Sequence, residues 1–142
     1  MAGSVKVSVD LNTHRKMLEG TVGAMLFSGL DENEKHSGIS IELLNTLRSD
    51  CAVFLYLLSI VHSGRMTKWS VQQEAKRRVF FEPERAGADL WLTRAGAGCG
   101  FWDGDWDEPG EHEVGDYLKW LANLIPQVEV YVGDDGYIYG TW

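Results

Sequence analysis

The sequence predicts an α+β fold in which N-terminal helices pack on a small antiparallel sheet made of two C-terminal hairpins, in the order ααα-ββ-α-ββ. Three patterns support this prediction. Before Pro83, apolar residues recur every three or four positions, as in amphipathic helices. After Pro83 the spacing moves towards two, which is typical of strands, and two glycine-rich segments have the composition of hairpin turns. At 142 residues and 44% hydrophobic composition, the chain suits a single domain over residues 1–142.

A first helix is predicted over residues 11–27, where most apolar residues fall at helical spacing. Gly20 and Gly23 weaken this prediction, because a glycine inside a helix costs about 1 kcal/mol relative to alanine. The polar residues 28–37 that follow are expected to form a solvated loop.

The strongest helical pattern begins after Ser40, a residue suited to cap a helix N-terminus. Apolar residues from Ile41 to Val61 step by three or four positions, and Gly64 is expected to end this helix. A short third helix is predicted over residues 70–79, which contain the basic cluster of the chain.

The first predicted hairpin follows Pro83. Residues 89–94 and 100–103 resemble short aromatic strands, and the glycine-rich residues 95–99 between them form a turn that permits positive φ. The second hairpin combines the alternating residues 127–132 and 137–139 with a Gly-Asp-Asp-Gly turn.

A further helix is predicted between the hairpins, over residues 111–125. Val114, Leu118 and Ile125 share one face of it, and the acidic residues crowd its first turns, where the helix dipole favours negative charge. Pro126 ends this helix.

The acidity of the chain is local. Residues 89–142 contain eleven Asp or Glu against two Lys or Arg, whereas the whole chain has a formal net charge of −8. Five of the six tryptophans lie in the same segment, so large rings alternate with carboxylates. This mixture favours a protein-binding surface and argues against direct nucleic-acid binding, because phosphates repel carboxylates.

The sequence also predicts where the protein works. No apolar run approaches the roughly 18 to 20 residues of a membrane helix, and the N-terminal residues lack the apolar core of a signal peptide. We therefore expect no membrane partner and a cytosolic location. In that reducing compartment, Cys51 and Cys99 are expected to be free thiols.

Three features of the sequence each have a chemical interpretation and a simpler one. The glycine loop 95–100 lacks the helix N-terminus and the lysine of a phosphate-binding loop, which favours a plain turn. A Cys99–His pair is a second, weaker alternative. Asp103, Asp105 and Asp107 alternate like the start of a calcium loop, but the glycine and the final glutamate of that loop are missing. A degenerate Ca²⁺ or Mg²⁺ site therefore remains an alternative to a solvated acidic loop.

The sequence surroundings of four tryptophans and one tyrosine predict which of them are buried and which are exposed. Trp91, Trp102 and Tyr131 occupy expected strand positions and are predicted to belong to the core. Trp106 and Trp142 lie in polar or terminal contexts and are predicted to be exposed anchors for a partner.

Two motifs resemble those of a known group of proteins. The segment from Asp89 to Asp103 and the segment from Val130 to Gly140 resemble small uncharacterised proteins of tailed bacteriophages. Those proteins carry a WLTR-N-G-H-G-x-G-FWD segment and a C-terminal YVGDDG-x-IY hairpin. Here Ala95 and Ala97 stand where the group has Asn and His, so proton transfer or metal binding by that histidine cannot operate. The resemblance implies a phage origin, and accessory phage proteins of this size are often inhibitors of host defence.

Together, these patterns predict a non-enzymatic acidic phage protein without cofactor or metal. It would act in the cytoplasm of the infected bacterium by inhibiting a host protein or defence complex, such as a CRISPR effector, as an anti-CRISPR or DNA-mimic protein. The predicted contact residues are Asp103, Asp105, Trp106, Asp107, Glu108, Glu111 and Glu113, with Asp134 and Asp135 as a second acidic tip. The alternatives are a small metal- or nucleotide-binding domain and a virion assembly protein.

Overall fold

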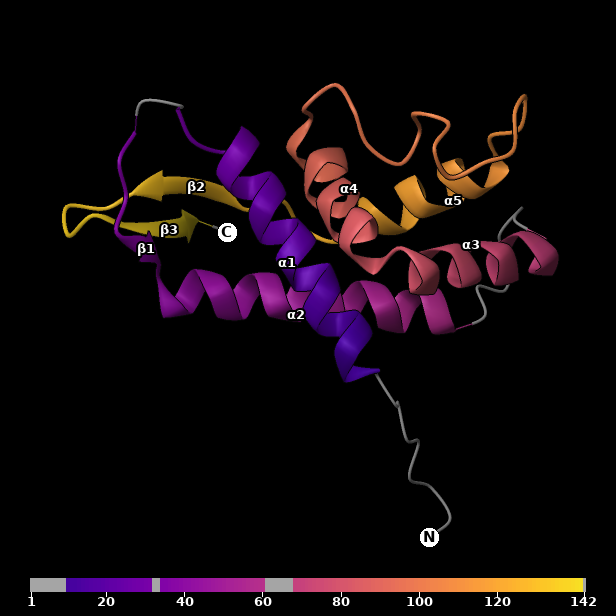
Figure 1. Ribbon diagram of the computed structural model, residues 1–142, viewed down its shortest axis with the longest axis horizontal. Coiled ribbons are helices and arrows are strands. Elements are labelled where there is room, and N and C mark those ends of the chain that lie inside the picture. Colours follow the sequence, from indigo (N-terminus) through magenta and orange to yellow (C-terminus); the bar gives the residue numbers. More distant parts are fainter. Residues whose placement is uncertain (1–9, 32–33, 61–67, 142) are drawn as a thin grey trace, which may run out of the picture.

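The computed structural model of the protein describes residues 10–31, 34–60 and 68–141. In chain order its elements are α1 (Leu11–Ser28), β1 (Gly38–Ile39), α2 (Ile41–Ser59), α3 (Trp69–Phe81), α4 (Pro83–Ala95), α5 (Glu113–Ala122), β2 (Glu129–Val132) and β3 (Tyr137–Thr141). Figure 1 shows an elongated molecule with the sheet at one end and α3 and α5 at the other, while α2 runs along its length. The α+β class is confirmed, with one hairpin in the described residues where two were predicted.

The helix α2 supports both ends of the molecule. Ser40 caps it, since its hydroxyl accepts a hydrogen bond from the Leu43 N–H at 3.2 Å. Leu43 and Leu47 of its first half join the core beside the sheet. Further along, Phe54 and Leu58 join a second core shared with α3, α4 and α5. The helix ends at Ser59, and the predicted stop at Gly64 lies outside the described residues.

The helix α1 packs along α4 through two glycines. A Cβ atom on Gly20 would overlap the carbonyl oxygen of Glu84, and one on Gly87 would overlap that of Met17. The two backbones therefore approach closely, and the Thr21 hydroxyl donates a 2.9 Å hydrogen bond to the Gly87 carbonyl. The predicted first helix is confirmed, and Gly20, which weakened that prediction, is a contact on which the packing depends.

The first predicted hairpin is wrong. Residues 89–94 belong to α4, which has Pro83 in its first turn and is capped after Ala95 by Gly96, with φ 65°. Its buried residues Ala86, Leu90 and Arg94 are four positions apart, so the segment has a helical period beside the alternation that predicted a strand. Residues 100–103 form turns and bends, because Phe101 is drawn into the core.

The second predicted hairpin is confirmed. Strand β2 pairs antiparallel with β3, and Gly136 in the turn has φ 87°. The sheet has a third strand that was not predicted: β1 lies between the expected loop and α2, and it pairs parallel with the other side of β3. Strand β1 is only two residues long, so its own sequence carries no periodic signal.

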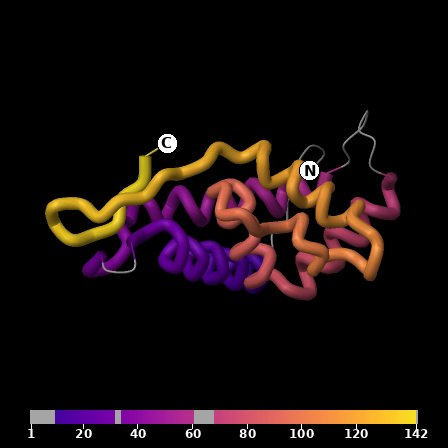
Figure 2. Tube along the Cα trace, turned by 90° about the horizontal axis from the view of Figure 1, so that it is seen from above, coloured from indigo at the N-terminus to yellow at the C-terminus, as the bar shows by residue number. Residues whose placement is uncertain are grey.

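The two remaining helices match their predictions with shifted ends. Residues 70–79 lie within α3, and the helix predicted over residues 111–125 is α5. Figure 2 shows the molecule from above, with the hairpin at one end and the long segment between α4 and α5 towards the other. The two acidic parts of the sequence are therefore far apart in space.

Candidate functional site

The central residue of the predicted site is buried. Trp106 is only 1% exposed, and its indole N–H donates a 2.6 Å hydrogen bond to Asp89 on α4. Its ring lies against Phe101 at a centroid distance of 5.5 Å, and Phe101 stacks on Phe54 of α2 at 5.6 Å. The prediction that Trp106 is an exposed anchor is wrong, because the long loop folds back and fills the space over α2 with its own rings. Trp142, the other predicted anchor, lies outside the described residues.

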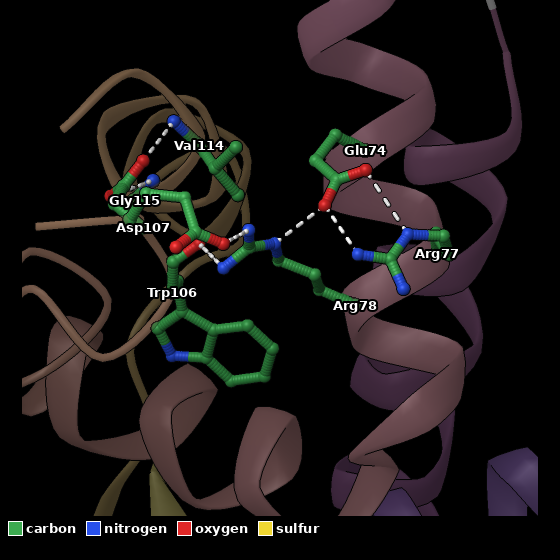
Figure 3. A network of polar contacts seen from close by, with 8 residues as sticks. Glu74, Arg77, Arg78, Trp106, Asp107, Val114 and Gly115 are labelled. Atoms are coloured by element: carbon green, nitrogen blue, oxygen red, sulfur yellow. Dashed lines mark hydrogen bonds and ion pairs between the residues drawn. The ribbon is translucent and has the colours of Figure 1, made fainter. Parts of the chain in front are cut away.

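Asp107 is a helix cap. One carboxylate oxygen accepts a 2.9 Å hydrogen bond from the Val114 N–H, and the other accepts a 3.0 Å bond from the Gly115 N–H. Figure 3 shows this carboxylate at the first turn of α5. Both bonds satisfy backbone donors that a helix N-terminus leaves without intrahelical partners, and negative charge is favoured there. The carboxylate therefore fixes the loop to α5.

Arg78 on α3 holds the same loop from the other side, as Figure 3 shows. Its guanidinium donates to the Trp106 carbonyl at 2.9 Å, to Glu108 at 2.9 Å and to Glu74 at 2.8 Å. Hydrogen bonds from Arg77 and Arg78 lower the pKa of Glu74 to about 2. The basic cluster predicted on α3 thus neutralises part of the acidic loop within the molecule.

The other two aspartates of the alternating run point to different partners. Asp103 accepts a 3.0 Å hydrogen bond from the Gly100 N–H, and Asp105 forms an exposed ion pair with Arg85 at 3.3 Å. The three aspartates therefore do not converge on one point. Within the described residues, no group of three or more His, Cys, Asp or Glu side chains is arranged to hold a metal ion.

The glycine loop is a structural connection. Gly96 and Gly98 have φ angles of 65° and 82°, which confirms the positive φ expected there. The loop leads into Phe101, whose N–H donates a 3.1 Å hydrogen bond to the Thr93 hydroxyl. A Cβ atom on Gly100 would overlap that hydroxyl. The loop does not open a helix, so it lacks the geometry of a phosphate-binding turn.

The segment from Asp89 to Asp103 also provides a buried ion pair. Arg94, whose side chain is 1% exposed, donates 2.9 Å and 3.0 Å hydrogen bonds to Asp50 on α2 and to the Pro126 carbonyl. Burial raises the pKa of Asp50, and the Arg94 guanidinium opposes that shift. The pair joins α2, α4 and the segment after α5, so this motif residue has a structural role.

The cysteines are free thiols, as predicted. Cys51 is buried beside the Thr21 hydroxyl at 3.4 Å, and burial raises its pKa to about 11. Such a thiol is protonated near neutral pH and is a poor nucleophile. Cys99 is half-buried in the glycine loop, and His62 lies outside the described residues.

The exposed acidic residues among the predicted contacts fall into two groups at opposite ends of the molecule (Figures 1 and 2). We call the first group the acidic loop face; it consists of Asp103, Asp105, Glu108, Glu111 and Glu113, all exposed. Asp134 and Asp135 form the second group, at the turn of the hairpin. The predicted surface is therefore two separate surfaces.

The hairpin presents aromatic rings on its outer face, including Tyr131, which was predicted to belong to the core. Tyr131 and Tyr137 are 49% and 43% exposed, and Tyr131 stacks across the strands on Tyr139 at 6.0 Å. The Tyr139 hydroxyl donates to Asp135 at 2.5 Å, which raises the pKa of Tyr139 to about 12 and lowers that of Asp135. We call Tyr131, Tyr137 and Tyr139 the tyrosine face. The three tyrosines occupy alternate strand positions, and side chains at alternate positions share one face of a sheet. This alternation is the sequence signal from which the tyrosine face could have been predicted.

A groove of about 760 Å³ lies between α1 and the start of α4. Its lining residues include Lys16, Glu19, Gly23, Phe81 and Arg85. The glycine loop does not line it, so this groove does not support the nucleotide-binding alternative that was based on that loop.

No protein-family model, curated protein or solved structure matches the chain. None of the helices in the described parts of the chain has both the length and the apolar character needed to cross a bilayer.

Proposed function

We propose that this protein is a non-enzymatic acidic binding protein that inhibits a host antiviral defence component through the acidic loop face. The observation that carries the proposal is the exposure of Glu108 and Glu111 on the loop, and of Glu113 at the start of α5, beside residues that are fixed internally. Arg78, Arg85 and Lys119 offset part of this charge, but seven carboxylates lie between residues 103 and 116. The surface keeps an excess of negative charge.

The loop is suited to recognition because it is held before a partner arrives. Trp106 is buried beneath it, Asp107 ties it to α5, and Arg78 binds its backbone. A surface that is already ordered loses less conformational entropy on binding, which leaves more of the interaction energy for affinity. In this proposal Trp106, Asp107 and Arg78 hold the loop in place, while Glu111 and Glu113 contact the partner.

The chemistry of the surface specifies a basic partner site. Carboxylates at this density repel nucleic acid and complement the lysine- and arginine-lined channel of a nucleic-acid-binding complex. The resemblance to small tailed-phage proteins makes host defence the first class to test, and a CRISPR effector complex fits that description. In this proposal the protein acts in the cytoplasm of the infected host.

The test is a charge reversal with a matched control. Glu111→Lys/Glu113→Lys changes the acidic loop face, whereas Glu34→Lys/Glu84→Lys makes the same change of net charge elsewhere. Glu84 matches Glu113 because both are exposed acidic residues in the first turn of a helix. Each protein is expressed in bacteria that carry an active CRISPR system, and the plating efficiency of a targeted phage is measured over a panel of such systems.

We expect the wild-type protein and the Glu34/Glu84 control to restore plating in at least one system, and the Glu111/Glu113 variant to lose that effect. Equal protection by both variants would contradict a role for the acidic loop face. Protection in none of the systems would reject the CRISPR effector as the target class. A thermal shift with divalent metal or nucleotides, or detection of the protein in purified virions, would favour the two alternatives predicted from the sequence.

A further inference from the structure

The hairpin has an open edge. In the described residues the strand order is β1-β3-β2, so β2 has a partner on one side only. The Gly133 N–H donates a 2.8 Å hydrogen bond to the Tyr137 carbonyl, which fixes the alternation of bonded pairs along the hairpin. By that alternation, the backbone N–H and C=O groups of Val130 and Val132 point away from β3. They form a short row of donors and acceptors at the sheet edge.

The tyrosine face lies beside this edge. Tyr131 is on the edge strand itself, between the two valines, and its ring is stacked on Tyr139 of the central strand. The valine side chains lie on the opposite face of the sheet and pack against the core. A segment added to β2 would therefore place every second side chain next to Tyr131, on the exposed face.

The charge around this edge is negative. The chain has no lysine or arginine after Lys119, whereas Glu129, Asp134 and Asp135 lie on the hairpin. Glu42 at the start of α2 also interacts with Tyr139, and Glu34 offsets the neighbouring Lys35. Two copies pairing edge to edge would bring these carboxylates together, which opposes self-association. Tyrosine rings and carboxylates instead complement arginine and lysine through cation–π contacts and ion pairs.

We propose that β2 and the tyrosine face form a second binding site, which accepts an extended, arginine- or lysine-bearing segment of a partner protein by strand addition. The added strand pairs with the outward backbone groups of Val130 and Val132, while its basic side chains lie over Tyr131 and near Glu129. This site is at the other end of the molecule from the acidic loop face, and it does not depend on the function proposed for that face.

The probe is a fluorescein-labelled peptide, Ser-Arg-Val-Arg-Val-Arg-Ser, titrated against the purified full-length protein by fluorescence anisotropy. A peptide with glutamate in place of arginine tests the charge. Two further peptides carry N-methyl groups either on both valines or on all arginines. Alternate N–H groups of a strand face opposite sides, so strand addition is blocked by one pattern and tolerated by the other.

Protein variants separate the backbone from the side chains. Val130→Pro removes the outward N–H at a position where an edge strand tolerates proline, and Val130→Ala is its control, since it loses the same packing but keeps the N–H. We expect the proline variant to bind the arginine peptide about three- to tenfold more weakly than the alanine variant. Tyr131→Ala is expected to weaken binding about threefold. The Glu111→Lys/Glu113→Lys variant should bind the peptide as the wild type does.

Several results would overturn this proposal. They are absence of binding by the arginine peptide, equal binding by the glutamate peptide, and equal effects of the two N-methyl patterns. Loss of binding in the Glu111/Glu113 variant would also overturn it, because the peptide would then be responding to net charge. If the proline variant does not fold, the N-methyl peptides still decide the question with the wild-type protein. A failure here leaves the phage-plating test of the acidic loop face unaffected.

Discussion

Residues 99–113 and residues 129–141 have similar compositions, each mixing aromatic rings with carboxylates and glycines. In the first segment the rings of Phe101 and Trp106 are buried, and the aspartates bond to groups of the same molecule. In the second segment Tyr131 and Tyr137 are exposed on the outer face of a hairpin. Composition alone therefore does not decide whether an aromatic, acidic segment faces a partner or the core.

The difference has a geometric cause. The long connection between α4 and α5 spans a surface of α2 that already presents Phe54, so its rings can be buried by folding back. A two-stranded ribbon has two faces, and only one of them can rest on the core. Val130 and Ile138 occupy that inner face, which leaves the tyrosines outside.

The largest expected effect is on stability and comes from Trp106. Trp106→Ala should lower the free energy of unfolding by about 3 to 5 kcal/mol, because it removes a buried ring and the partner of Asp89. Trp102→Ala is the control, since Trp102 lies at the surface beneath the Lys119 ammonium, 5.2 Å from the ring centroid. It should cost about 1 kcal/mol or less. Urea unfolding of both variants measures the loss of stability. Equal losses would contradict the burial of Trp106 relative to Trp102.

The next effect concerns the cap of α5. Asp107→Ala should cost about 1 kcal/mol, because two N–H groups at the helix N-terminus lose their acceptor. Asp105→Ala should change stability by less than about 0.5 kcal/mol, because its ion pair with Arg85 is exposed. Thermal denaturation of the two variants distinguishes a capping loop from a solvated one. A smaller loss for Asp107→Ala than for Asp105→Ala would refute the capping role.

Removing the Tyr131 ring from the hairpin is expected to have little effect on stability. Tyr131→Ala should lower the free energy of unfolding by about 0.2 to 1 kcal/mol, the range for a cross-strand aromatic pair. Urea unfolding measures this beside Trp106→Ala. A loss as large as that of Trp106→Ala would mean that Tyr131 is buried in solution, and the tyrosine face would then be unavailable to a partner.

The smallest effect is a change of pKa. The Tyr139 hydroxyl and the Tyr137 N–H lower the pKa of Asp135 in the folded protein. This stabilisation is present above the ordinary carboxyl pKa of about 4 and is lost as the pH falls through the lowered value. Tyr139→Phe should therefore raise the pKa of Asp135 towards its ordinary value. An NMR titration of the side-chain carboxyl carbon measures the shift, and an unchanged pKa would show that the hydroxyl does not bond to Asp135.

Several local features were predictable from the sequence because their causes are local. The Ser40 cap and the apolar stripe of α2, the first helix, and the Gly-Asp-Asp-Gly turn each depend on residues within a few positions of one another. The net charge and its concentration after residue 89 follow from counting. The exposure of the predicted acidic residues other than Asp107 was also predictable, whereas Trp106 and Asp107 support the fold.

Only the tertiary structure decided the rest, because the deciding contacts join residues that are distant in sequence. Residues 89–94 are helical where α4 meets α1 at Gly20 and Gly87, and Arg94 reaches Asp50 across 44 positions. Arg78 holds the Trp106 carbonyl across 28 positions. Periodicity describes one element at a time, whereas burial of a ring or use of a carboxylate depends on what the fold brings next to it.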